Sequence, residues 1–144
     1  MAALPPDLLA GWKILVVDDE IDSLMVAQNL LTRCGAQVLT ASNGTEGFEL
    51  AKQHLPRFII TDLSMPIMNG WQLIDALKQN LSTAEIPTIA LSAHAMSGDR
   101  EKAMGAGFTN YLSKPLVPYS FVRDVLHLLV DTPKVADVLK QVEG

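Results

Sequence analysis

The stretch Thr61-Asp62-Leu63-Ser64-Met65-Pro66-Ile67-Met68-Asn69-Gly70 directly follows the apolar run Phe58-Ile59-Ile60. A short apolar run of this kind is typical of a strand that is buried on both faces. The Pro and the Gly that follow it predict a loop. The acid Asp62 therefore lies where a buried strand ends, at the mouth of the core, and its place there needs an explanation.

The same pattern of apolar run, polar loop and helical spacing recurs along the chain. Five strands that alternate with five helices predict an α/β fold with a parallel sheet, because each crossover must return before the next strand starts in the same direction. The expected strands are Lys13–Val17, Gln37–Ala41, Phe58–Thr61, Pro87–Leu91 and Asn110–Leu112. The expected helices run from Asp22 or Ser23 to Gly35, from about Thr45 to Pro56, from about Gly70 with Ile74, Leu77 and Leu81 inward, from about Gly98 to Ala106, and from about Pro118 to Val130.

We expect three segments: an N-terminal extension (1–12), one domain (13–130) and a C-terminal extension (131–144). In the last segment Val135, Val138, Leu139 and Val142 form one apolar stripe at helical spacing. This stripe favours a short helix from Lys134 to about Glu143, with a frayed tail as the alternative, because so short a helix is marginal unless it docks.

The composition limits the class of protein. Of 144 residues, 49% are hydrophobic and 19% charged, which is typical of a globular domain, and the net charge of −5 speaks against nucleic-acid or anionic membrane partners. The single cysteine, Cys34, excludes an intrachain disulfide and suits a reducing compartment. Since no signal peptide or long apolar run is evident, we expect a cytoplasmic protein.

Polar side chains follow four of the expected strands. Asp18 and Asp19 follow the first, Asp62 the third, Ser92 the fourth and Lys114 the fifth. Open α/β sheets bind ligands at the carboxyl ends of their strands. If the first and third strands are neighbours, three carboxylates converge, and their repulsion is relieved by a raised pKa or by a bound cation such as Mg²⁺. Each acid alone could be a helix cap, but the joint pattern favours a site.

Four motifs carry a resemblance to a known family: Val17-Asp18-Asp19-Glu20, Thr61 to Gly70, Ala90-Leu91-Ser92-Ala93 and Tyr111-Leu112-Ser113-Lys114-Pro115. In order and spacing they resemble the receiver domain of two-component response regulators, over about Lys13 to Val130. The resemblance implies the flavodoxin-like (βα)5 fold, with a five-stranded parallel sheet of order 2-1-3-4-5 and helices on both faces.

The resemblance also implies roles for the acids. Asp62 would accept a phosphoryl group from the phosphohistidine of a histidine kinase or phosphotransfer protein. Asp19 and Asp62 would bind Mg²⁺ directly, together with the backbone carbonyl of Ser64, and Asp18 would act largely through a bound water. The position of Asp62 at the mouth of the core is then explained, because a partner must reach it.

Lys114 would pair with Asp62 and afterwards with the phosphoryl oxygens. A lysine before a proline is also a common loop dipeptide, but Pro115 keeps Lys114 out of a helix, and we expect a cis peptide bond between them. In the loop after Asp62, we expect Gly70 to adopt a backbone conformation that residues with a Cβ resist.

The resemblance makes Ser92 the switch hydroxyl and Tyr111 the switch aromatic residue. Ser92 would donate a hydrogen bond to the phosphoryl group, and the loop after the fourth strand would then move inward. Tyr111 would rotate into the space that this loop leaves. Ser64 and His94 would modulate phosphate lifetime, although a lone loop histidine is more often a surface residue. The face of the fourth helix, fifth strand and fifth helix would then bind a downstream protein.

We therefore expect a signalling module, not an enzyme beyond its own phosphorylation and dephosphorylation, that is either a stand-alone regulator or the receiver fragment of a hybrid histidine kinase. An aspartyl-nucleophile phosphohydrolase is an alternative, but Ser64 stands where many such enzymes place a second acid. A nucleotide-binding domain would need a Gly-rich phosphate loop, which is not evident here. The intact Asp, Ser and Lys set argues against a receiver-like scaffold that is never phosphorylated.

Overall fold

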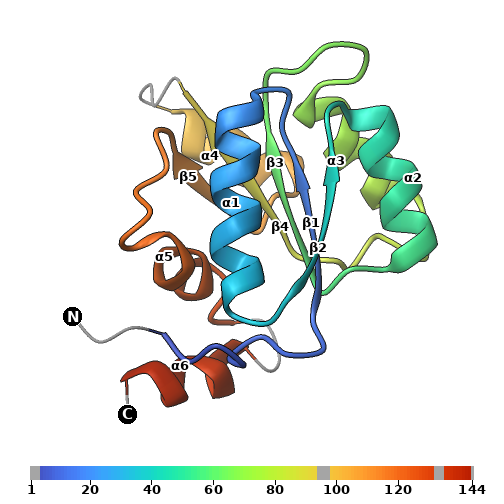
Figure 1. Cartoon of the computed structure of the whole chain (residues 1–144). Helices are drawn as coiled ribbons and strands as arrows, with labels where there is room; N and C mark the ends of the chain where they lie inside the picture. The colour runs from blue at the N-terminus through green and yellow to red at the C-terminus, as the bar shows by residue number, and fades with distance from the viewer. Residues whose placement is uncertain (1–3, 94–97, 132–134, 144) are drawn as a thin grey trace.

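The computed structural model describes residues 4–93, 98–131 and 135–143. Within these residues the chain forms one parallel sheet of five strands, in the order β2-β1-β3-β4-β5, and six helices (Figure 1). The predicted fold class and strand order are confirmed. The strands are β1 (Lys13–Val17), β2 (Gln37–Ala41), β3 (Phe58–Asp62), β4 (Thr88–Ser92) and β5 (Asn110–Ser113), and the helices are α1 (Ile21–Arg33), α2 (Gly44–His54), α3 (Gly70–Gln79), α4 (Asp99–Ala106), α5 (Phe121–Leu128) and α6 (Val135–Glu143).

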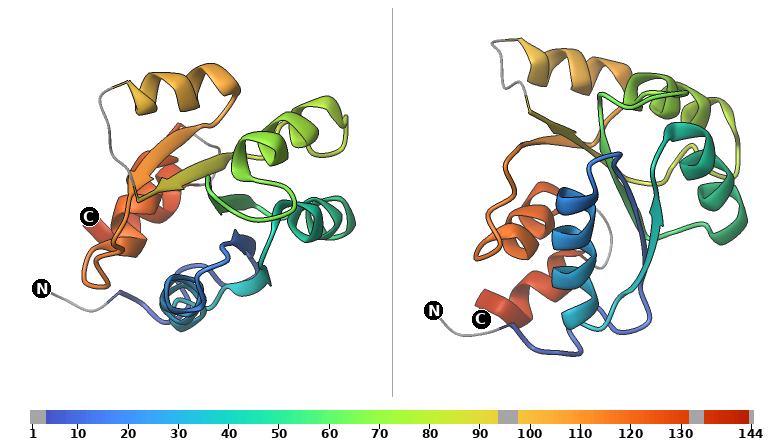
Figure 2. Two further views of the ribbon diagram at one scale, coloured as in Figure 1. Left: turned by 90° about the horizontal axis from the view of Figure 1, so that it is seen from above. Right: turned by 45° about the horizontal axis from the view of Figure 1, so that its top comes forward.

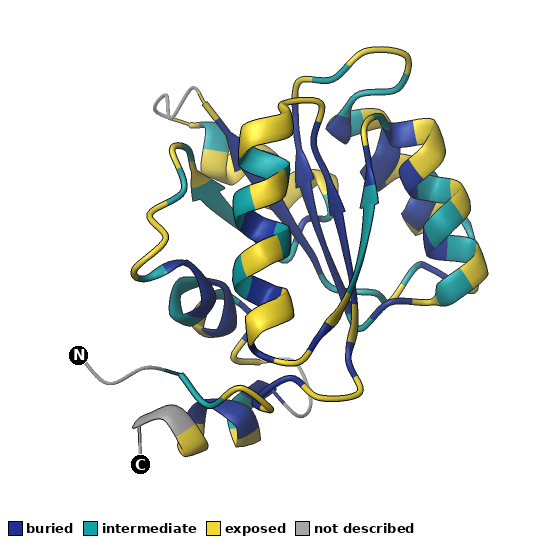
Figure 3. Ribbon diagram, in the orientation of Figure 1, coloured by how far each residue is buried: buried dark blue, intermediate teal, exposed yellow. Residues whose placement is uncertain are grey.

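Helices cover both faces of the sheet (Figure 2). Alternate side chains of a strand point to opposite faces, so Ile14 and Val16 of β1 pack with α1 and α5, whereas Leu15 and Val17 pack with α2 and α3. Figure 3 shows the central strands buried between helices whose outer faces are exposed. This double cover explains the apolar runs in the sequence.

The third helix is shorter than expected. α3 ends at Gln79, and Leu81, which we expected to point inward, is 98% exposed. The hydroxyl of Thr83 donates a hydrogen bond to the carbonyl of Leu77, at 2.7 Å, so that a side chain completes the last turn of the helix. The apolar spacing alone does not reveal this termination.

Gly70 is required for a reason other than the one expected. It is not among the residues with a positive φ angle. A Cβ atom at this position would overlap the carbonyl oxygen of Asp62 and lie 2.8 Å from Leu63 Cα. Gly70 therefore permits close packing of the start of α3 against the end of β3, and the expectation of an unusual backbone was wrong.

Both terminal segments pack onto the α1 and α5 side of the core. The expected C-terminal helix is present as α6, with Val135, Val138 and Leu139 buried. In the N-terminal segment Leu9 is fully buried, and its N–H donates a hydrogen bond to the carbonyl of Cys34 at 2.7 Å. Figure 1 shows these segments at the end of the molecule opposite to the carboxyl ends of β1 and β2.

None of the helices in the described part of the chain has the length and apolar character that crossing a membrane requires.

Candidate functional site

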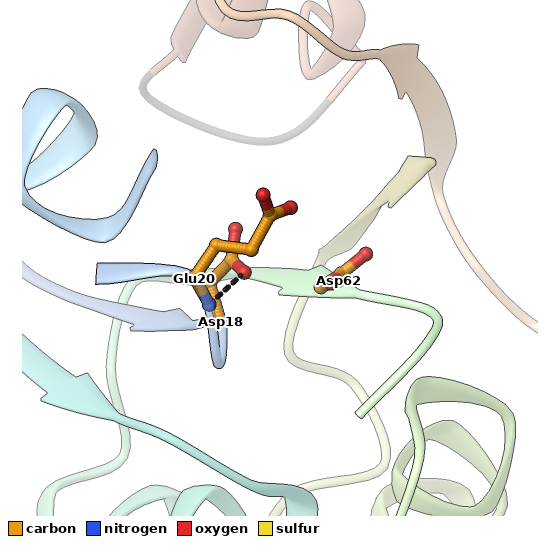
Figure 4. A group of neighbouring side chains, drawn as sticks. All are labelled: Asp18, Glu20 and Asp62. Carbon is orange, nitrogen blue, oxygen red and sulfur yellow. Dashed lines mark hydrogen bonds between the residues drawn. The ribbon is translucent and has the colours of Figure 1, made fainter. Parts of the chain in front are cut away.

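Two buried acids meet at the carboxyl ends of β1 and β3. These strands are paired neighbours, with Val17 opposite Thr61, so Asp18, directly after β1, and Asp62, the last residue of β3, lie side by side. Asp18 is 1% exposed and Asp62 5%. Glu20, two residues beyond Asp18, turns its carboxylate toward the same place (Figure 4), and one carboxylate oxygen from each of the three acids lies within 4.8 Å of the others.

The ammonium group of Lys114 lies among these acids. Its Nζ atom is 2.6 Å from Glu20 Oε1, 2.9 Å from Asp18 Oδ2 and 3.4 Å from Asp62 Oδ2. The lysine follows β5, and its backbone N–H donates a hydrogen bond to the carbonyl of Ser92, at the end of β4. Its peptide bond with Pro115 is cis, as expected. The sheet thus brings a cation from the edge strand to acids on two central strands.

The crowding of charges shifts the pKa values of this group. Burial, followed by the neighbouring charge of Asp18, raises the pKa of Asp62 from 3.8 to about 6, against the opposing effects of Lys114 and of a backbone hydrogen bond from Ser64. The hydrogen bond and the charge of Lys114 lower the pKa of Glu20. For Lys114 the largest effect, burial, lowers the pKa, but its bonds to Glu20 and Asp18 and the charges of Asp18 and Asp62 outweigh it, so that the pKa is raised.

The oxygen atoms of this group suit a divalent cation. Asp18 Oδ2 is buried and accepts no hydrogen bond from the residues that the structure describes, although Lys114 Nζ is 2.9 Å away. The ammonium donates its hydrogen bond to the other oxygen of this carboxylate, Asp18 Oδ1, at 3.2 Å, so its contact with Oδ2 is an ion pair. A buried carboxylate oxygen with spare capacity beside two further carboxylates is a donor set that Mg²⁺ accepts.

A cleft of about 580 Å³ opens in front of Asp62. Its wall includes Asp19, Ser64 and Ser92, together with Trp71 of α3 and Lys102 of α4. The Lys102 ammonium lies 4.8 Å from the centre of the Trp71 ring, a cation–π contact that places a positive charge in the cleft wall. The cleft is large enough for a group bound to Asp62 to be approached from solvent.

The candidate residues from the sequence fall into distinct places. Asp19 is exposed and lines the cleft, but its carboxylate is not one of the three that lie closest together. Ser92 is 6% exposed at the end of β4. Tyr111 is half-buried and packs against the α2 and α3 side of the core. Ser64 is exposed in the loop after β3, and His94 lies outside the described residues.

No role for Glu20 follows from the sequence, although its carboxylate makes the shortest of the three contacts with Lys114. Its only sequence signal is that it follows two acids at the end of the first strand. That signal does not distinguish an acid that turns into the cleft from one that points to solvent.

Known proteins match both the sequence and the fold. Residues 14–125 match the family model of the response regulator receiver domain. The polar-differentiation response regulator DivK of Brucella anthropi is 30% identical over 118 residues, which are 82% of this chain and 96% of that protein. The structure of the chemotaxis response regulator CheY4 of Vibrio cholerae superposes with a TM-score of 0.77 at 26% identity, covering 82% of this chain and 98% of that chain.

A third relative is the receiver domain of the sensor histidine kinase PA1611 from Pseudomonas aeruginosa, described with a magnesium ion coordinated in its active-site cleft. It has a TM-score of 0.74 and 28% identity and covers 83% of this chain and 98% of that chain. With the family match over most of its length, the chain belongs to the response regulator receiver domain family. It is a receiver domain of the two-component signalling class.

Proposed function

We propose that this chain is a Mg²⁺-dependent phosphoacceptor that takes a phosphoryl group from a phosphohistidine onto Asp62. The observation that carries the proposal is the convergence of the buried acids Asp18 and Asp62 with the buried Lys114 at one edge of the sheet. Family membership supports it, because receiver domains act in two-component signalling with histidine kinases.

In the proposed reaction a carboxylate oxygen of Asp62 attacks the phosphorus atom of the phosphohistidine. A P–O bond forms, the P–N bond breaks, and the imidazole keeps the electron pair and takes up a proton. The Lys114 ammonium, 3.4 Å from Asp62 in the structure, then pairs with the phosphoryl oxygens. Because a carboxylate is a weak nucleophile, the rate must come from positioning and from neutralisation of charge.

The metal would be held by the carboxylates of Asp19 and Asp62 and by the backbone carbonyl of Ser64, with Asp18 acting largely through a bound water. The bound ion would supply positive charge against the phosphoryl oxygens. The buried Asp18 Oδ2, which accepts no hydrogen bond from the described residues, supports this assignment, as does the magnesium ion described for the PA1611 receiver domain. The exposed side chain of Asp19 faces the cleft from which the ion would enter.

We further propose that Ser92 and Tyr111 transmit the modified state of Asp62. Ser92, the last residue of β4, lines the same cleft as Asp62. Tyr111 lies on the neighbouring strand β5, opposite Ala90 of β4. Among the residues of α4, Ala103 alone is buried, so this helix can shift at little cost in packing. The face made by α4, β5 and α5 is thus the proposed binding site for a downstream protein, with Ser64 and His94 as modulators of phosphate lifetime.

The proposal assigns the phosphoacceptor activity to residues 13–130, in the cytoplasm, whether the chain acts alone or within a hybrid histidine kinase. On this account the chain catalyses only its own phosphorylation and dephosphorylation.

A mass measurement tests the proposal. The chain is incubated with Mg²⁺ and acetyl phosphate, and its intact mass is compared with that of Asp62→Ala. We expect the wild type to gain one phosphoryl group and the variant to gain none. Equal gain in the two proteins, or no gain in the wild type with a donor that modifies another receiver domain in the same experiment, would contradict the proposal.

A further inference from the structure

Glu20 stands at the N-cap position of α1, but its side chain does not cap that helix. A side-chain oxygen at this position commonly accepts a hydrogen bond from the first turn of the helix. Here the carboxylate reaches Lys114 Nζ instead, at 2.6 Å, while the backbone N–H of Glu20 donates to Asp18 Oδ1 at 3.0 Å. Glu20 is therefore bonded to two residues of the site.

The three acids around Lys114 differ in their freedom to move. The side chains of Asp18 and Asp62 are 1% and 7% exposed and lie at the ends of buried strands. The Glu20 side chain is 60% exposed and approaches the ammonium from the solvent side. Of the three acids, Glu20 can leave the lysine most easily, because water can solvate its exposed carboxylate in place of the ammonium group.

We propose that Glu20 is a positioning residue that holds the Lys114 ammonium and competes for it with the phosphoryl group on Asp62. The inference rests on the proposed function. Lys114 lies closer to Glu20 than to Asp62, at 2.6 Å against 3.4 Å. When a doubly negative phosphoryl group forms on Asp62, the lysine moves from Glu20 toward Asp62 and the Glu20 carboxylate turns to solvent.

The competition has measurable consequences. Glu20→Gln keeps the length of the side chain and removes its charge, so Lys114 gains freedom to meet the phosphoryl group and an anionic donor meets less repulsion. At low salt and saturating Mg²⁺ we expect phosphorylation by acetyl phosphate to become about threefold to tenfold faster, and the gain to shrink at high salt. Affinity for Mg²⁺ alone, followed by the fluorescence of Trp71 in the cleft wall, should weaken by a similar factor.

A second variant separates pairing from simple loss of charge. Glu20→Asp keeps the negative charge but shortens the side chain, so that it no longer reaches Lys114. If positioning matters, Glu20→Asp should also release the lysine and raise the phosphorylation rate. Glu49→Gln is the matched control, because it removes an exposed carboxylate that is 2.9 Å from Lys52 on α2 and does not line the cleft. It should leave the rate of phosphorylation as in the wild type.

The direct readout is the exchange of the Lys114 ammonium protons with water, measured from the side-chain ¹⁵N signal without metal or donor. Exchange should become about threefold to tenfold faster in Glu20→Gln and Glu20→Asp, since a charge-assisted hydrogen bond is lost. Unchanged exchange in both variants, or a phosphorylation rate of Glu20→Asp equal to that of the wild type, overturns the inference. If the wild type takes no phosphoryl group, the proposed function and the competition both fail, and the exchange rates then decide only whether Glu20 holds Lys114.

Discussion

Lys114 Nζ lies 3.4 Å from Asp62 Oδ2. Asp62 is the last residue of β3 and Lys114 follows β5, and β4 lies between these two strands. The long lysine side chain spans the end of β4 and supplies a positive charge to acids that come from β1 and β3. The sheet order makes these contacts possible, because only β4 separates β5 from β3, and only β3 and β4 separate it from β1.

The first prediction concerns the removal of this charge. Lys114→Met leaves three carboxylates without their nearest cation, and we expect it to lower the free energy of unfolding by about 2–3 kcal/mol in EDTA. Excess Mg²⁺ should restore much of the loss, since an ion that binds the folded state stabilises it. Lys52→Met, which removes a half-exposed partner of Glu49, should cost under about 1 kcal/mol. Equal losses in urea denaturation of the two variants would show that the buried cluster does not depend on Lys114.

The second prediction concerns pH. The pKa of Asp62 is raised to about 6 in the folded protein, so the fold favours its neutral form. Stability from this group is therefore present at low pH and is lost as pH rises from about 4 to about 7. Asp62→Asn lacks this loss. At about pH 7.5 in EDTA we expect Asp62→Asn to be about 1–2 kcal/mol more stable than the wild type. The whole pKa shift of Asp62 corresponds to roughly 3 kcal/mol, but water in the cleft screens the charge and reduces the effect.

Urea denaturation of both proteins across this pH range measures the difference, with the exposed Asp7→Asn as the control. A constant difference between wild type and Asp62→Asn at all pH values would mean that the titration of Asp62 is not its cause.

The third prediction uses two glycines. Gly70→Ala forces a Cβ against the Asp62 carbonyl and Leu63, and we expect a loss of about 3 kcal/mol, together with slower phosphorylation because the end of β3 must shift. Gly105→Ala in α4 meets no atom within 4 Å and should stabilise the protein by about 0.5–1 kcal/mol. Thermal unfolding of the two variants checks both signs, and a harmless Gly70→Ala would remove the packing argument.

How much of this structure the sequence predicts depends on the kind of signal. The apolar runs that end in Asp18, Asp62 and Ser92 give the fold class, because a strand buried on both faces needs a continuous apolar segment. The strand order is implied only by the family resemblance, since periodicity does not say which strands are neighbours. Once β1 and β3 are adjacent, the meeting of Asp18 with Asp62 follows.

Other features depend on contacts between residues that are distant in sequence. The direction of the Glu20 side chain depends on Lys114, which follows the edge strand β5. The end of α3 before Leu81 depends on a side-chain hydrogen bond from Thr83. The need for glycine at position 70 is a matter of space beside β3, and it cannot be distinguished in sequence from a need for an unusual φ angle.

The fourth prediction concerns the C-terminal helix. Leu139 of α6 is 5% exposed and belongs to the core cluster shared with α1 and α5. Leu139→Ala should lower the free energy of unfolding by about 2–3 kcal/mol, whereas the exposed Lys140→Ala should change it by less than about 0.5 kcal/mol. Because α6 lies at the opposite end of the molecule from the site (Figure 1), neither variant should alter the rate of phosphorylation under conditions where both are folded. A matching loss of phosphorylation in Leu139→Ala would show that the two ends are coupled.

The central claim is tested most directly by locating the phosphoryl group in the chain. After phosphorylation with Mg²⁺ and acetyl phosphate, borohydride reduces an acyl phosphate of aspartate to homoserine, which peptide mass spectrometry assigns to a position. The account predicts homoserine at position 62 and unmodified aspartate at positions 18 and 19. Homoserine at position 18 or 19, or its formation in Asp62→Asn at the wild-type level, would contradict the account.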